Sequence, residues 1–152
     1  WGSETPSEFL QATVDYARRK GVAIVASAGN EPTGVPVYPA AYPGVLGISA
    51  VQETGALWEN SNTGDFISLA APGTASFPVG YKGPPGAYAG TSISGAYVSR
   101  ALALYFMKHP GATVEQAVSA LTAAVSDAGP EGRDDRFGHG VLDAAAVERL
   151  LR

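Results

Sequence analysis

Hydrophobic positions near the start of the chain follow helical spacing. Leu10 and Val14 lie on one apolar stripe within residues 6–20, which end in three basic side chains. Thr5 has the features of an N-cap for this helix, and Gly21 has those of a C-cap. The pattern therefore predicts a first helix that begins at residue 6 and ends before Gly21.

Three uninterrupted apolar runs separate the polar parts of the chain. They cover residues 21–25, 45–51 and 66–71, and each is short for a helix. Such runs are typical of strands that are buried on both faces of a parallel sheet. Residues 75–89 predict a hairpin with its tip at residues 82–86, where glycine and proline dominate.

Three more helices are expected after the hairpin. The first is a long apolar segment from residue 92 to residue 109, and the last covers residues 144–151 behind Asp143. Between them, Thr113 and Gln116 match a capping box. Helices that alternate with buried strands predict an α/β fold, a parallel sheet with helices on both faces. No linker or repeat divides the chain, so one domain is expected.

Composition indicates a globular protein and argues against several partners. The chain has 152 residues, 45% of them hydrophobic and 16% charged, which is enough to bury a core. The net charge is −4 and no basic patch is visible, so nucleic acid is not an expected partner. No apolar stretch approaches the roughly 18 residues of a membrane span, so a membrane is not expected either.

The ends and the cysteine content add little about the cellular compartment. The chain has no cysteine, which excludes disulfides and thiolate metal sites and leaves the redox compartment undetermined. It starts with Trp1 instead of Met and has no signal-peptide pattern. We therefore expect a fragment, or a processed or shortened chain.

A small hydroxyl residue stands where the long helix is predicted to begin. Thr91 or Ser92 could cap the helix by accepting hydrogen bonds from its first free N–H groups. Ser92 could instead be a nucleophile, because the positive end of the helix dipole favours developing negative charge. These residues alone favour the cap, since caps are common and nucleophiles are rare.

A polar amide follows the first predicted strand. Asn30 comes after the apolar run at residues 21–25, at the carboxyl end of that strand, where open α/β sheets bind ligands. An asparagine N–H at such an edge can stabilise an oxyanion. The alternative is a turn without chemistry, because a Gly-Asn pair favours positive φ.

Together these two stretches resemble a known family. Residues 28–31 (Ala-Gly-Asn-Glu), followed by residues 90–92 (Gly-Thr-Ser), are similar to the second half of the catalytic domain of subtilisin-like serine proteases, the subtilases. Three further motifs match in family order: residues 38–45 (Tyr-Pro-Ala-Ala-Tyr-Pro-Gly-Val), 71–73 (Ala-Pro-Gly) and 137–144 (Phe-Gly-His-Gly-Val-Leu-Asp-Ala). The resemblance implies that residues 1–152 are the C-terminal part of a single subtilase catalytic domain with a three-layer fold.

The resemblance also implies roles for individual residues in a serine endopeptidase. Ser92 would be the nucleophile of an acyl-enzyme mechanism, and the side chain of Asn30 would be an oxyanion-hole donor beside the backbone N–H of Ser92. The implied substrate-binding residues are Gly2, Ala26, Ser27, Ala28 and Gly29. Gly2 would end a strand that pairs with the peptide backbone, and the small side chains of residues 26–29 favour a roomy, apolar specificity pocket, although the loop near Val37 at its floor is shorter than in many relatives.

The rest of the catalytic triad is not expected in this chain. In subtilases the Asp and His precede the Ser, on motifs that are absent here. The two histidines are His109, at a helix end, and His139, at a variable position of the closing motif. The expected partners are therefore a peptide or protein substrate and an N-terminal part that bears Asp and His, covalently joined or separate. No cofactor is expected.

Some departures from the family pattern leave alternatives open. Gly95 and Ala96 replace a small residue and a proline, and Arg100 stands where Gly is usual. A catalytically inactive pseudoprotease that binds peptides or supports assembly is one alternative, and a purely structural product without activity is another. The family alone implies a secreted or extracytoplasmic location.

A weak cation site of the family also has a counterpart in this chain. Its ligands would be the carbonyls of Ala40, Tyr42 and Val45, with Ser68 where the family has Asp. Carbonyls bind hard cations poorly without a carboxylate, so no metal is predicted.

Overall fold

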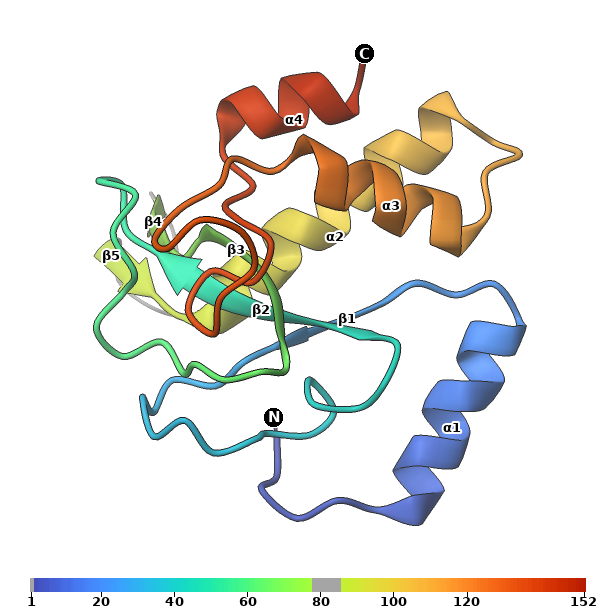
Figure 1. The fold of residues 1–152 in the computed structure, drawn as a ribbon, viewed down its shortest axis with the longest axis horizontal. Helices are drawn as coiled ribbons and strands as arrows, with labels where there is room; N and C mark the ends of the chain where they lie inside the picture. The colour runs from blue at the N-terminus through green and yellow to red at the C-terminus, as the bar shows by residue number, and fades with distance from the viewer. Residues whose placement is uncertain (1, 78–85) are drawn as a thin grey trace.

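The computed structural model describes residues 2–77 and 86–152 as a layered α/β structure (Figure 1). The elements in chain order are α1 (Glu8–Arg19), β1 (Ile24–Ser27), β2 (Val45–Val51), β3 (Ile67–Pro72), β4 (Thr74–Phe77), β5 (Gly86–Ala89), α2 (Thr91–Lys108), α3 (Val114–Ala124) and α4 (Ala144–Leu150). Strands β1, β2 and β3 pair in parallel in that order. Strands β4 and β5 form a separate antiparallel hairpin. Residues 82–85 of the tip predicted at residues 82–86 lie outside the described residues, and Gly86 is the first residue of β5.

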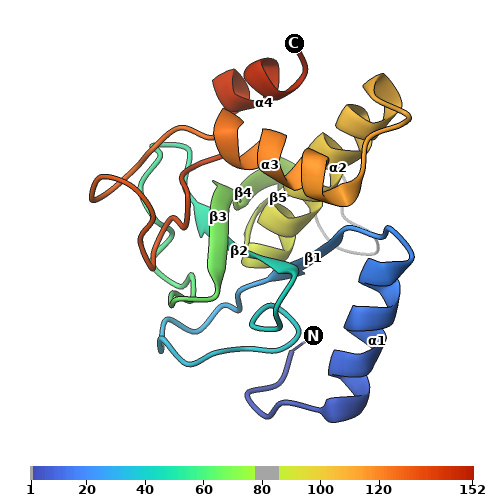
Figure 2. The same cartoon turned by 45° about the vertical axis from the view of Figure 1, so that its right-hand side comes forward.

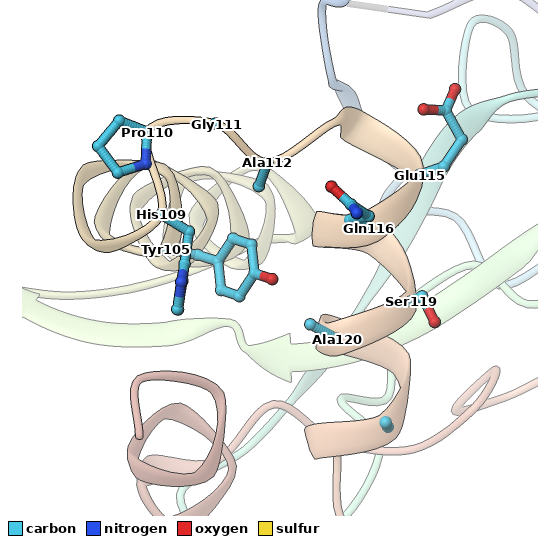
Figure 3. A pocket seen from close by; sticks show the side chains of 10 residues that line it. Tyr105, His109, Pro110, Gly111, Ala112, Glu115, Gln116, Ser119 and Ala120 are labelled. Atoms are coloured by element: carbon cyan, nitrogen blue, oxygen red, sulfur yellow. The ribbon is translucent and has the colours of Figure 1, made fainter.

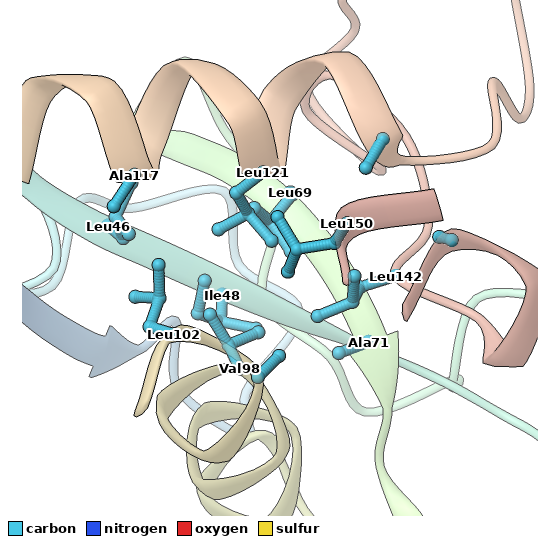
Figure 4. Packing of buried hydrophobic residues seen from close by; sticks show 13 residues of the cluster. Leu46, Ile48, Leu69, Ala71, Val98, Leu102, Ala117, Leu121, Leu142 and Leu150 are labelled. Atoms are coloured by element: carbon cyan, nitrogen blue, oxygen red, sulfur yellow. The ribbon is translucent and has the colours of Figure 1, made fainter. Parts of the chain in front are cut away.

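Helices cover both faces of the parallel sheet (Figures 1 and 2). On one face α1 packs through Val14 against a small cluster that includes Tyr42 and Val45. On the other face α2, α3 and α4 bury the main apolar core (Figure 4). Its largest fully buried members are Ile48, Leu69, Leu121, Leu142 and Val98. This arrangement is the two-sided helix–sheet packing that the sequence pattern predicts.

The three strands differ in burial because their positions in the sheet differ. Strand β2 lies in the middle, and all seven of its residues are buried, as predicted. Strand β1 is only half-buried along its whole length, so the prediction of burial on both faces is wrong for it. Within the described residues β1 pairs with β2 alone and has one open edge. It also begins three residues later than predicted, because Gly21 and Val22 still hydrogen-bond to the last turn of α1.

The opposite edge of the sheet is covered by the closing motif. The N–H of Ala70 donates to the carbonyl of Gly140 at 2.9 Å, and the N–H of Leu142 donates to the carbonyl of Ala70 at 2.8 Å. Gly138 approaches β3 so closely that a Cβ placed on it would lie 2.3 Å from the carbonyl carbon of Ser68. In the described residues, β1 therefore keeps an open edge while β3 does not.

Replacing Gly138 with alanine is expected to destabilise the protein by about 3 kcal/mol or more. The residue has φ +60°, which costs about 1–2 kcal/mol for alanine, and the added methyl group would overlap the backbone of β3. Gly132 is a matched control, because it has φ +85° but nothing within 4 Å of the added Cβ. Urea unfolding of the full-length protein should show a loss of only about 1–2 kcal/mol for Gly132→Ala. Equal losses for the two variants would contradict the close-approach argument.

The first helix begins later than the sequence predicts. Its N-cap is Ser7 instead of Thr5, and the Ser7 hydroxyl accepts the N–H of Leu10 at 3.4 Å. Tyr42 explains the difference. Its hydroxyl accepts the N–H of Ser7 at 2.7 Å and donates to the Ser7 carbonyl at 3.0 Å, which holds Ser7 outside the helix. At the other end Lys20 is the C-cap, and Gly21 follows it with φ +73°.

The later helices begin where the sequence predicts. Thr113 and Gln116 form both hydrogen bonds of the capping box at the start of α3. The carboxylate of Asp143 accepts the N–H of Ala146 at 2.7 Å and caps α4. Across the described ranges, no helix is long and apolar enough to pass through a bilayer.

Candidate active site

The candidate site is built where the loop after β1 meets the start of α2. The backbone N–H of Thr91 donates to Oδ1 of Asn30 at 3.0 Å, and the Thr91 hydroxyl donates to the same oxygen at 2.8 Å. The hydroxyl oxygen of Thr91 in turn accepts the N–H of Gly29 at 3.2 Å. These contacts join two segments that lie 61 positions apart in the sequence and hold the Asn30 side chain beside the helix start.

The same contacts decide which end of the amide is available. A backbone N–H can only donate, so the atom of Asn30 that meets Thr91 is the oxygen, and the Nδ2 group is the donor left over. A Cβ placed on Gly90 would lie 3.5 Å from Nδ2 of Asn30 and 4.0 Å from the backbone nitrogen of Ser92. The amide nitrogen of Asn30 and the backbone nitrogen of Ser92 therefore both lie close to Gly90. Such an arrangement can stabilise a developing oxyanion.

Ser92 is the second residue of α2, and its side chain is exposed. The helix N-cap is Gly90, and the side chains of Thr91 and Ser92 do not cap the helix, so the capping role considered for them is wrong. The first N–H of α2, that of Thr91, donates to the Asn30 side chain instead. Thr91 is instead engaged by Asn30 and Gly29. Within the described part of the chain the Ser92 hydroxyl has no hydrogen-bond partner. It lies at the positive end of the α2 dipole, where negative charge on oxygen is favoured.

A depression of about 340 Å³ lies on one side of Ser92, between α2 and the open edge of β1. It is lined by Val25, Ala26, Ser27, Pro39, Ser92, Gly95, Ala96 and Ser99. Two of the predicted substrate-binding residues, Ala26 and Ser27, thus share a surface with the candidate nucleophile. Ala28 is fully buried and lines neither this depression nor the groove described next.

A second groove, of about 290 Å³, adjoins Asn30 on another side. It is lined by Gly2, Ser3, Glu4, Gly29, Asn30, Glu31, Thr33, Val37 and Asn62. The predicted residues Gly2 and Gly29 belong to this groove. Its character differs from the roomy, apolar pocket that the sequence favoured. Glu4 and Glu31 add carboxylates, and the Val37 side chain approaches Gly2 so closely that a Cβ there would lie 2.5 Å from Cγ1 of Val37.

Asn62 is the residue that the sequence analysis missed. Its side chain is 1% exposed and donates from Nδ2 to the carbonyls of Ala28 and Val35, at 3.1 and 2.9 Å. Its Oδ1 accepts the N–H groups of Gly34 and Thr63 at 2.9 and 3.0 Å. Because three of these four hydrogen bonds go to the loop that carries Asn30, Asn62 holds that loop in place. It stands in a turn-rich stretch, where nothing in the local pattern distinguishes it from a surface asparagine.

His109 and His139 lie away from Ser92. His109 is the C-cap of α2, at the opposite end of the helix, and its ring packs on Tyr105 with the centroids 4.5 Å apart. The backbone N–H of His139 donates to the carbonyl of Ser68 in β3, at the sheet edge opposite β1. Neither histidine can serve as the base for Ser92 from these positions.

A depression of about 850 Å³ lies beside His109, but its described side chains do not form a catalytic group with the histidine (Figure 3). It lies between the end of α2 and α3, and Glu115 and Ser119 point away from the histidine ring (Figure 3). Hydrogen bonds from the Glu115 backbone and the Thr113 side chain lower the pKa of the Glu115 carboxyl, as expected at the first turn of a helix. The lowered pKa of Glu115 thus follows from its position at the start of α3 and does not indicate a catalytic role.

The residues at the family's weak cation site do not fit a bound cation. The Ser68 hydroxyl, which replaces the family carboxylate, accepts the N–H of Gly47 at 3.2 Å. The guanidinium of Arg18 lies against Gly44, since a Cβ there would be 2.1 Å from its Nε. A fixed positive charge beside carbonyl ligands disfavours a second cation.

Replacing Gly90 with alanine is expected to leave the fold intact and to lower, at least about tenfold, the peptide hydrolysis that the family resemblance implies. The residue has φ 162°, which any residue adopts, and the added methyl group would make only ordinary contacts of 3.5 Å and longer. That methyl group would lie 3.5 Å from Nδ2 of Asn30 and 4.0 Å from the backbone nitrogen of Ser92, where it would crowd an oxygen bound to both donors. Steady-state kinetics and thermal unfolding of the full-length protein check both parts. Unchanged kcat with a correctly folded variant would show that no oxyanion forms above Gly90.

Comparison with known proteins places the chain among proteases. A sequence profile of the subtilase family matches residues 1–140. The chain is 34% identical over 146 residues to the minor extracellular protease Epr of Bacillus subtilis (strain 168), covering 95% of this chain and 23% of that protein. It is 33% identical over 150 residues to subtilisin E of the same organism, covering 96% of this chain and 39% of that protein. The chain thus spans well under half the length of either relative.

Two solved protease structures have the same arrangement of elements. A lanthipeptide protease superposes with a TM-score of 0.81 at 20% identity, covering 93% of this chain and 54% of that one. The psychrophilic subtilisin-like protease Apa1 from the Antarctic psychrotroph Pseudoalteromonas sp. AS-11 superposes with a TM-score of 0.84 at 15% identity, covering 97% and 68%. At these identities the likeness establishes the fold alone, and it confirms the predicted three-layer α/β architecture.

Proposed function

The chain belongs to the subtilase family, and from that premise we propose that it is the nucleophile-bearing part of a serine endopeptidase. Ser92 attacks the scissile carbonyl, and the Asn30 amide and the Ser92 backbone N–H bind the resulting oxyanion. The observation that supports this most directly is the pair of Thr91 hydrogen bonds to Oδ1 of Asn30. They leave Nδ2 as the free donor beside the helix that carries the serine.

The proposed reaction passes through an acyl-enzyme. The Ser92 oxygen bonds to the carbonyl carbon, its proton goes to a histidine base, and the electron pair of the C=O bond moves to the oxygen. When the tetrahedral intermediate collapses, the C–N bond breaks and the leaving amine takes the proton. Water then repeats the attack on the ester and releases the acid and Ser92. The N–H donors of Asn30 and Ser92 stabilise the negatively charged tetrahedral intermediate more than the neutral substrate.

The histidine and its orienting aspartate come from an N-terminal part, joined to this chain or separate from it. The open edge of β1 and the depression beside Ser92 support this element of the proposal. The four residues of β1 are half-buried although three of them are apolar, which is unfavourable for an edge strand in water. A strand of the N-terminal part would cover them and bring the histidine to the same side as Ser92.

Labelling with a fluorophosphonate probe tests the proposed nucleophile. Ser92 should be modified in the full-length protein that contains the Asp and His motifs, and not in the isolated 152-residue chain. Ser92→Ala should abolish labelling, and Ser119→Ala, on the far helix α3, should not. Absence of labelling in the full-length protein, with the fold intact, would reject the proposal.

A peptide-binding pseudoprotease is the second candidate. The departures at Gly95, Ala96 and Arg100 motivate it, and the first two line the depression beside Ser92. None of them contacts the Asn30–Thr91 pair through a hydrogen bond in the described residues. Peptide binding without turnover, unchanged in Ser92→Ala, would favour this candidate over the protease.

A further inference from the structure

The backbone of Gly29, directly before Asn30, is held from two sides. Its carbonyl accepts the backbone N–H of Asn62 at 3.0 Å, and its N–H donates to the hydroxyl oxygen of Thr91 at 3.2 Å. The Nδ2 group of Asn62 also donates to the carbonyl of Ala28 at 3.1 Å. Gly29 has φ +103°, and because glycine has the widest backbone freedom, these hydrogen bonds fix its conformation. Asn62 therefore binds both carbonyls that precede Asn30.

Asn62 is itself anchored to the central strand of the sheet. Its side chain is buried, and so is that of Ser61 before it. The hydroxyl oxygen of Ser61 accepts the N–H of Ala50 in β2 at 3.0 Å. A buried side chain whose hydrogen bonds are all made keeps one orientation. Asn62 therefore links the loop that carries Asn30 to β2.

The contacts with Thr91 alone leave the direction of the Asn30 amide undetermined. Both hydrogen bonds from Thr91 reach the same atom, Oδ1 of Asn30, so the amide could turn about that oxygen. The other end of the side chain is attached to the backbone. The direction of Nδ2 therefore depends on where the backbone at residues 29–30 lies. A donor stabilises an oxyanion best when it is held in position before the reaction.

We propose that Asn62 is a positioning residue that fixes the direction of the Nδ2 group of Asn30. This inference rests on the proposed function, because it gives Asn30 the role of oxyanion donor. Asn62 acts through the backbone and does not donate to the substrate, since its own Nδ2 hydrogens go to the carbonyls of Ala28 and Val35. Without Asn62 the loop can shift, and a displacement of about 1 Å at a catalytic group can cost about 100-fold in rate.

A double-mutant cycle in the full-length protein tests the coupling between Asn62 and Asn30. Asn62→Ala is expected to lower kcat by roughly 10- to 100-fold. In an Asn30→Ala background no donor remains to be positioned, so the same change should lower kcat by less than about threefold. A role only in stability or in the shape of the groove would lower kcat equally in both backgrounds or raise KM alone. Either of these results would overturn the proposal.

The matched control for the cycle is Asn60→Ala. Asn60 is an exposed asparagine in the same segment as the buried Asn62. Its replacement should leave kcat within about twofold, as for an ordinary surface substitution. Asn62→Ser keeps one hydrogen-bonding group at the buried position, and it should show the same coupling to Asn30 at smaller size if the alanine variant does not fold.

Hydrogen exchange gives a readout that does not depend on turnover. The N–H groups of Gly29 and Thr91 keep their acceptors in the Asn62 variants, namely the Thr91 hydroxyl and Oδ1 of Asn30. They should nevertheless exchange at least about tenfold faster than in the wild-type protein, while the amides of β2 change much less. If the wild-type protein does not hydrolyse peptides, the protease proposal fails, and this faster exchange would still support Asn62 as the residue that fixes Asn30. Unchanged exchange at Gly29 and Thr91, or equal acceleration in β2, would overturn that role.

Discussion

Ser92→Ala in the full-length protein is expected to reduce peptide hydrolysis by about 10⁴-fold or more. The variant removes the atom that forms the acyl-enzyme, and no described residue at the site offers a second nucleophile in the same place. The Ser92 side chain is exposed and has no hydrogen-bond partner among the described residues, so stability should change little. Active-site titration with matched thermal unfolding curves would measure the two effects separately.

The control for this experiment is Ser119→Ala. Ser119 is also an exposed helical serine, but it lies on α3 beside the end of α2 that is remote from Ser92. Its replacement should leave kcat/KM within about twofold, as for a surface substitution without special contacts. If Ser92→Ala kept more than a tenth of the activity, the nucleophile would have to be another group.

Asn30→Ala is expected to lower kcat by about 10²- to 10³-fold with little change in KM. This magnitude is known for the corresponding donor of subtilisin and is transferred here from that relative. The physical reason is that the Nδ2 hydrogen bond strengthens only when the carbonyl oxygen becomes negatively charged, so its loss raises the barrier more than it weakens substrate binding. Steady-state kinetics on the full-length protein would separate the two constants.

Asn30→Asp distinguishes the two ends of the amide. An aspartate keeps an oxygen that can accept from Thr91, but it replaces the Nδ2 donor with negative charge. Asn30→Asp should therefore lower kcat at least as much as Asn30→Ala does, while the fold remains intact. Thr91→Val keeps the backbone N–H that donates to Asn30 and removes the two hydroxyl contacts, at 2.8 Å to Asn30 and 3.2 Å to Gly29. It should lower kcat much less, by about tenfold. An active Asn30→Asp variant would show that Asn30 serves to position the helix and not to donate to an oxyanion.

Local sequence patterns were sufficient for most of the fold. Helix caps and apolar runs act over a few residues, so the starts of α3 and α4 and the whole of β2 could be predicted. The start of α1 could not, because it depends on the Tyr42 hydroxyl, which comes from a loop 35 positions away and holds Ser7 outside the helix. The exposure of β1 was missed for a similar reason, since an apolar run does not indicate whether both of its neighbours are present.

For the candidate site, too, some features follow from the sequence and others only from the tertiary structure. Sequence alone identified the family, and it predicts the candidates Ser92 and Asn30 and a histidine base outside this chain, because these follow from residue types in a fixed order. Tertiary structure decided which end of the Asn30 amide is free, that Asn62 secures its loop, and that Val37 narrows the adjoining groove. Each of these depends on contacts between residues that are distant in the chain, and such contacts leave no trace in local periodicity.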